Sequence, residues 1–220
     1  PRPAPPSDSP KPNPAPDTSF STAPVVIEKS SEIVEPEPSP KTGLFSFLST
    51  KQKGKYITAS VRDLINRAAV TKGRWKYVVV HNSGTRQGNA KAFDDYHSRV
   101  RKMQNGLAYH FVIGNGTSTG DGQIEVGNRW KRQISGGHVH SDYMNSVGIG
   151  ICLVGDYNHH KPTAKQLESL EELIRFLRTR VGKSEGKELI VQPHRAVNPP
   201  RWATDCPGDQ FPYAWLKSKF

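Results

Sequence analysis

Residues 75–81 read WKYVVVH, and residues 147–156 read VGIGICLVGD. Both runs are apolar and are bounded by loop residues or glycine, which is the pattern of strands buried on both faces of a sheet. Two further runs share this character, AYHFVIGNG (108–116) and ELIVQ (188–192), and a short strand near 123–126 is expected to pair with the former. The sequence therefore predicts a central sheet built from several short strands.

Helical patterns separate these runs. The clearest helix begins with Thr163 and Gln166, which have capping-box spacing, and ends at Gly182. A second helix is expected from Asn89 to about Met103. Its apolar face would be formed by Phe93, Tyr96, Val100 and Met103. With weaker helices before the first strand and at the C-terminus, we expect an α/β fold: a single domain with a central mixed β-sheet flanked by helices.

The first 50 residues differ from the rest in composition. Twelve of the 18 prolines fall in residues 1–40, where apolar residues show no periodicity. Such a segment buries too little surface to offset the entropy of ordering. We therefore expect a disordered Pro-rich segment over residues 1–50, a short docking element at Leu44–Leu48, and the folded domain over residues 51–220.

Charge divides along the same boundary. Residues 1–50 hold four Lys and Arg and six Asp and Glu, a net charge of −2; since the whole chain carries +11, residues 51–220 carry +13. This excess attracts polyanions, and both nucleic acid and an anionic cell wall fit it. A nucleic-acid-binding domain needs a basic stripe or a reading element, whereas Lys and Arg are scattered here, so we expect no nucleic-acid partner. No run of 18 apolar residues occurs, so no membrane-spanning helix is expected.

Three residues have side chains suited to binding a metal ion. His81 ends a predicted strand, while His194 and Cys206 lie in the loop region after the last one. Two imidazoles and one thiolate suit tetrahedral zinc, with the fourth position left for water. The spacings of 113 and 12 residues match no short zinc signature. The alternative is a strand-end His81, a surface His194 and an inert Cys206.

From about Trp75 to Trp215 the chain resembles a superfamily of zinc amidases. It includes N-acetylmuramoyl-L-alanine amidases, phage lysozyme-like amidases and animal peptidoglycan recognition proteins. The matching stretches, in order, are VVVHNSGT, AYHFVIGNG, GGHV, NSVGIGICLVGDYN, PTAKQL and HRAVNPPRWATDCPGDQFP. Several ordered matches are more specific than any single one. The resemblance implies that His81, His194 and Cys206 hold Zn²⁺. A Cys152–Cys206 disulfide is the structural alternative.

The resemblance also implies roles around the metal. Tyr109 is implied to hydrogen-bond the developing oxyanion, as is the Thr204 hydroxyl, while His138 is implied to contact substrate. The alternatives are a core aromatic for Tyr109, a turn residue for Thr204 and a plain surface loop for His138. Some relatives carry a general-base glutamate on the strand that matches residues 147–156. In this sequence the corresponding residue is Gly150.

The function expected from the resemblance is zinc-dependent hydrolysis of the amide between N-acetylmuramic acid and L-alanine in peptidoglycan. The alternative is a module of the same fold that binds peptidoglycan or muropeptides without cutting them, as relatives lacking the cysteine ligand do. Cys206 is present, which favours the enzyme. From the substrate class we expect an extracytoplasmic location, and we expect a monomer.

Overall fold

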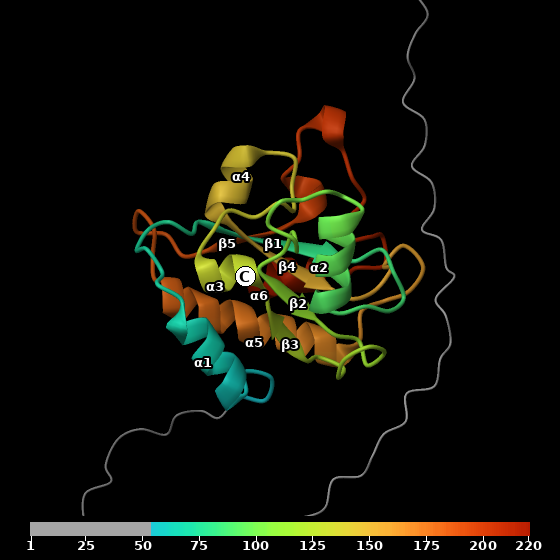
Figure 1. Cartoon of the computed structure of the whole chain (residues 1–220), viewed down its shortest axis with the longest axis horizontal. Helices are drawn as coiled ribbons and strands as arrows, with labels where there is room; N and C mark the ends of the chain where they lie inside the picture. Colours follow the sequence, from blue (N-terminus) through green and yellow to red (C-terminus); the bar gives the residue numbers. More distant parts are fainter. Residues whose placement is uncertain (1–53) are drawn as a thin grey trace, which may run out of the picture. The chain divides into compact units, whose positions relative to one another are not determined.

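The computed structural model describes residues 54–220. The Pro-rich segment expected over residues 1–50 and the docking element expected at Leu44–Leu48 lie outside the described residues. The described part is a single α/β domain, as the sequence predicts (Figure 1). Within it, no helix is both long and apolar enough to span a lipid bilayer.

A five-stranded mixed sheet forms the centre, with the strand order β3-β2-β4-β1-β5. Its strands are β1 (Tyr77–Asn82), β2 (Phe111–Ile113), β3 (Ile124–Val126), β4 (Gly148–Leu153) and β5 (Ile190–Pro193). β1 lies between β4 and β5 and is parallel to both, while β3 pairs antiparallel with β2. Because parallel strands end at the same edge, the loops after β1 and β5 emerge side by side.

Helices cover the sheet on both sides. They are α1 (Ala59–Arg67), α2 (Ala90–Arg99), α3 (Asn128–Arg132), α4 (Asp142–Val147), α5 (Ala164–Val181) and α6 (Tyr213–Lys219), with short 3₁₀ turns at His194–Ala196 and Pro200–Trp202. The main apolar core joins α1, α5 and α6 to one face of the sheet. A small second cluster on the other face includes Leu107, Val112 and Cys152, with Phe93 of α2 packed against it. α3 and α4 were not predicted.

The two helices predicted in detail had different outcomes. In α5, Thr163 accepts from the Gln166 N–H and the Gln166 side chain reaches back to the Thr163 N–H, so the capping box is confirmed. The predicted apolar face of α2 was wrong: Tyr96 is 46% exposed and Val100 62% exposed. α2 ends at Arg99 and lies on the surface, and only part of its stripe contacts the core.

Candidate metal centre

The three predicted ligands come together at one edge of the sheet. His81 is near the end of β1, and His194 follows the last residue of β5, the neighbouring parallel strand. Cys206 is held close by a backbone hydrogen bond from the Arg195 N–H to the Cys206 carbonyl, 2.8 Å long. One ligand atom from each of the three residues lies within 4.8 Å of the others.

The donor atoms fit a zinc ion. His81 Nδ1 is 3.7 Å from Cys206 Sγ. His194 Nε2 is buried and has no hydrogen-bond partner among the described residues. A buried ring nitrogen without a partner is costly unless it coordinates something, and two imidazoles with one sulfur form a typical zinc donor set. The residues present therefore fit Zn²⁺.

Burial determines the charge state of these ligands. It lowers the pKa of both His81 and His194. The imidazoles are therefore neutral and their lone pairs are available. Burial also raises the pKa of Cys206 to about 12, so a neighbouring cation is needed to keep this sulfur as a thiolate at neutral pH.

His138 lies behind His81 and orients it. His138 Nε2 is 3.3 Å from the Gly148 carbonyl, which can only accept, so this nitrogen carries the proton. Burial lowers the pKa of His138 to about 3, so its ring is neutral and its Nδ1 accepts from His81 Nε2 at 3.0 Å. His81 is thereby left with a bare Nδ1 facing Cys206. His138 is only 7% exposed, and its predicted contact with substrate stays a prediction.

Two glycines make room for the His138 ring. A Cβ built on Gly150 would collide with His138 Cδ2, and one built on Gly136 would collide with the same atom. A glutamate at position 150, where some relatives are expected to carry their general base, would therefore displace His138. The β4 residue in register with His81 is Cys152, whereas Gly150 is in register with Val79.

Tyr109 stands beside the three ligands. Its ring centroid is 5.2 Å from that of His81. Burial and the neighbouring thiols of Cys152 and Cys206 raise the pKa of Tyr109 well above its usual value, so the phenol keeps its proton. Both cysteines are free in the structure, and the alternative Cys152–Cys206 disulfide is not formed. A protonated phenol next to a metal centre can donate a hydrogen bond to an oxyanion.

The Thr204 hydroxyl oxygen accepts a hydrogen bond from the Cys206 N–H at 3.2 Å. Thr204 therefore has the turn role that the sequence left open as an alternative. This bond uses only a lone pair of the oxygen, so the hydroxyl proton remains free to donate elsewhere.

Asn198 supports the centre and was missed by sequence reasoning. Its side-chain oxygen accepts from the His140 N–H at 3.2 Å, and its side-chain nitrogen donates to the Trp202 carbonyl at 3.0 Å. It lies on the loop that follows the ligand His194. No local signal marks this residue, because its partners come from two loops nearly 60 positions apart.

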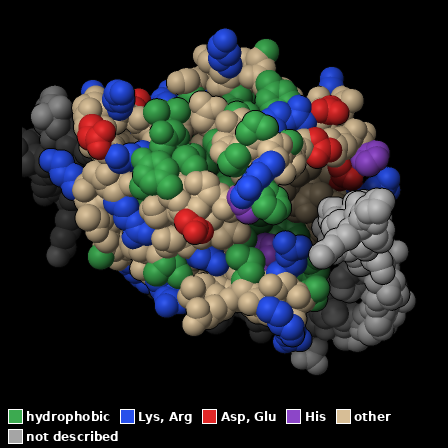
Figure 2. Space-filling view, turned by 90° about the horizontal axis from the view of Figure 1, so that it is seen from above, with side chains coloured by type: hydrophobic (Ala, Val, Ile, Leu, Met, Phe, Trp, Pro, Cys, Tyr) green, Lys and Arg blue, Asp and Glu red, His purple; other side chains and the backbone are tan. Residues whose placement is uncertain are grey.

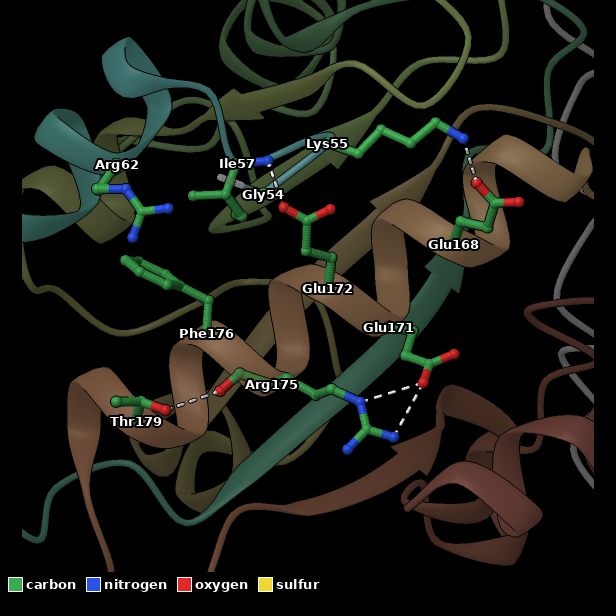
Figure 3. Close-up of a pocket in the computed structure, with 10 residues that line it drawn as sticks. All are labelled: Gly54, Lys55, Ile57, Arg62, Glu168, Glu171, Glu172, Arg175, Phe176 and Thr179. Atoms are coloured by element: carbon green, nitrogen blue, oxygen red, sulfur yellow. Dashed lines mark hydrogen bonds and ion pairs between the residues drawn. The ribbon is translucent and has the colours of Figure 1, made fainter. Parts of the chain in front are cut away.

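A separate surface pocket of about 540 Å³ lies between α1 and α5. In Figure 3 two pairs of its charged side chains point toward one another, Lys55 with Glu168 and Arg175 with Glu171, while Arg62 lies over the ring of Phe176. Glu172 accepts from the backbone N–H groups of Tyr56 and Ile57. These groups satisfy one another and lie on the α5 side of the sheet, so the pocket is not part of the metal centre.

Figure 2 shows histidine side chains at the surface near the middle of the view, with Lys and Arg dispersed over the same face. No continuous basic stripe crosses this face of the described residues, in keeping with the scattered charge of the sequence.

Comparison with known proteins identifies related chains. The family model described as N-acetylmuramoyl-L-alanine amidase matches residues 71–209. Peptidoglycan-recognition protein 2 of Holotrichia diomphalia is 31% identical over 143 residues, covering 60% of this chain and 67% of that protein. Peptidoglycan recognition protein 1 of Rattus norvegicus is 34% identical over 107 residues, covering 47% and 49%. The matches thus span about half to two thirds of these relatives' lengths.

Solved structures give the same picture. The N-acetylmuramoyl-L-alanine amidase LysC from Clostridium intestinale superposes with a TM-score of 0.54 at 26% identity, covering 66% of this chain and 85% of LysC. Drosophila PGRP-LB superposes with a TM-score of 0.53 at 25% identity, covering 68% and 83%. A point mutant of PGRP-LB has been solved in complex with tracheal cytotoxin and superposes with the same TM-score.

Proposed function

The chain belongs to the N-acetylmuramoyl-L-alanine amidase family, and we propose that it is an active, zinc-dependent amidase. Its substrate would be the amide bond between N-acetylmuramic acid and L-alanine in peptidoglycan. The observation that carries this proposal is the complete donor set of His81, His194 and Cys206, with ligand atoms within 4.8 Å of one another. A catalytic zinc site has three such protein ligands, with the fourth coordination position left open.

The roles of the chain's own residues follow from their geometry. When bound, zinc would polarise the scissile carbonyl and lower the pKa of the attacking water toward neutrality. Tyr109 keeps its proton and would donate a hydrogen bond to the oxygen that becomes negative. Thr204 has a free hydroxyl proton and would donate to the same tetrahedral species. His138 would hold His81 in the coordinating tautomer.

The second candidate function is a module that binds muropeptides without cutting them. It is supported by the names of the relatives, which are peptidoglycan recognition proteins. The buried, unpartnered His194 Nε2 favours the enzyme, because binding peptide or sugar needs no such atom. Mass spectrometry of digested sacculi separates the two functions, since only an amidase releases free stem peptides.

The deciding experiment measures metal and activity on one sample. Purified full-length protein is assayed for zinc content and for release of stem peptide, before and after dialysis against a chelator. We expect cleavage to disappear with the zinc and to return when zinc is restored. Cys206→Ala should lose both, while His159→Ala, at an exposed histidine that pairs with Asp156, should keep both. Full activity in metal-free protein would refute the proposal.

The substrate also suggests where the protein works. We propose an extracytoplasmic location, because the glycan–peptide mesh lies outside the cytoplasm. We also propose that the enzyme is a monomer. The net charge of +13 over residues 51–220 would favour association with anionic wall polymers.

A further inference from the structure

An exposed tryptophan stands on the loop between two of the metal ligands. Trp202 ends the 3₁₀ turn Pro200–Trp202, in the segment that joins His194 to Cys206. It is 45% exposed, although tryptophan is usually largely buried. Tryptophan is enriched at binding surfaces, because its large apolar ring carries one N–H donor and suits a contact that is partly wet.

The indole is held in place from several sides. Its ring stacks on the ring of His140, with centroids 3.9 Å apart and an interplanar angle of 25°. The Arg201 guanidinium carbon lies 5.5 Å from the indole centroid. Asn198 fixes the backbone of both partners, since it accepts from the His140 N–H and donates to the Trp202 carbonyl. The side chain is therefore a preorganised platform rather than a freely moving tip.

The loops that hold the stacked Trp202 and His140 rings also carry residues of the metal centre. Asn198 lies two residues after the 3₁₀ turn His194–Ala196, which the ligand His194 begins. His140 is two residues beyond His138, whose ring is bonded to the ligand His81. Both partners of the stack therefore lie on loops that also carry residues of the metal centre: Trp202 lies between the ligands His194 and Cys206, and His140 follows His138.

The chemistry of the platform favours a sugar ring. The His140 ring covers one face of the indole, so a pyranose would pack its C–H face against the part of the indole that stays exposed, while Arg201 and His140 supply donors for hydroxyl and N-acetyl oxygens. An apolar peptide side chain would instead prefer a concave pocket. We propose that Trp202 and His140 form a stacking subsite for a sugar ring of the glycan strand. The inference rests on the proposed function, since the scissile bond joins a sugar to a peptide.

A binding experiment without a cleavable bond tests the subsite separately from catalysis. Zinc-loaded full-length protein is titrated, by calorimetry, with soluble glycan strands of alternating N-acetylglucosamine and N-acetylmuramic acid that lack stem peptides. We expect Trp202→Ala to weaken binding about tenfold, equal to loss of about 1.4 kcal/mol of stacking. Trp202→Phe should retain most of the affinity, because it keeps an aromatic face. His140→Ala should weaken binding about threefold.

Tyr143→Ala is the matched control. Tyr143 is an exposed aromatic, 56% accessible, on α4, where it lines a different small pocket with Lys76 and Glu185. This variant should bind the glycan like the wild type, and all variants should keep their zinc content and unfolding temperature.

The outcomes separate this inference from the amidase proposal. If wild-type protein binds no peptide-free glycan, or if Trp202→Ala binds it as tightly as wild type, the subsite is refuted even when cleavage is normal. If the protein cleaves nothing but loses glycan binding in Trp202→Ala, the amidase proposal fails and the subsite stands.

Discussion

The same strands form both faces of the central sheet, but the side chains on the two faces have different roles. On the α5 face, Val80, Ile149 and Ile151 are fully buried in the main apolar core. On the opposite face, His81 and Cys152 are in register, and the space over Gly150 is filled by an imidazole. Because successive side chains of a strand point to opposite faces, neighbouring residues of one strand belong in turn to the apolar core and to the metal-binding face. Substitutions on the two faces should therefore have separable effects.

The largest effect is expected from removing a ligand on the metal-binding face. His194→Ala should reduce amidase activity by on the order of 10³-fold or more, because the metal site loses one of its three donors. Thermal unfolding of the metal-free protein should change little, since His194 lies outside the main core. Rates on sacculi and calorimetry of the metal-free form measure the two effects. A large loss of stability with activity retained would contradict the division between the faces.

A substitution on the α5 face should instead lower stability and leave zinc binding unchanged. Ile151→Ala removes a fully buried side chain next in sequence to Cys152 and should lower the free energy of unfolding by about 2–5 kcal/mol. The folded fraction should bind zinc as tightly as wild type, because the side chain points away from His81. Urea unfolding and zinc titration below the transition provide the measurements. Weakened zinc binding in the folded fraction would show that the faces are coupled.

A smaller effect is expected behind the metal centre. His138→Ala removes the acceptor that holds the His81 tautomer and should weaken zinc binding about 10–100-fold. Competition with a chelator of known affinity measures this change, and His159→Ala is the control. An unchanged zinc affinity would mean that His138 does not position His81, and its predicted substrate contact would then be the role left to test.

The smallest effect concerns a residue at the N-terminus of α5. Thr163→Ala removes the N-cap of α5: the hydroxyl that accepts from the Gln166 N–H and donates to the Asp121 carboxylate. It should lower the free energy of unfolding by about 1 kcal/mol. Zinc affinity and the rate of cleavage should both be unchanged. Denaturant midpoints compared with wild type measure the loss, and a change in activity would show that α5 influences the opposite face.

Sequence reasoning succeeded where the signal was local and strong. α5 begins with a capping box and buries apolar residues at helical spacing along its 18 residues, a length sufficient to show the helical period. It failed for α3 and α4, which have five and six residues and are too short to show a period. It also failed for the apolar face of α2, because periodicity shows that a stripe exists but not whether a neighbour covers it.

The sequence by itself determined the strands, the fold class and the three side chains whose atoms suit zinc, together with the family resemblance that groups them. Only the tertiary structure decided that β5 runs beside β1, which brings His194 to His81 across more than one hundred residues. It also decided that His138 fills the space over Gly150 and that Asn198 links the two loops. Such contacts depend on packing between distant segments, and packing leaves no periodic trace in the local sequence.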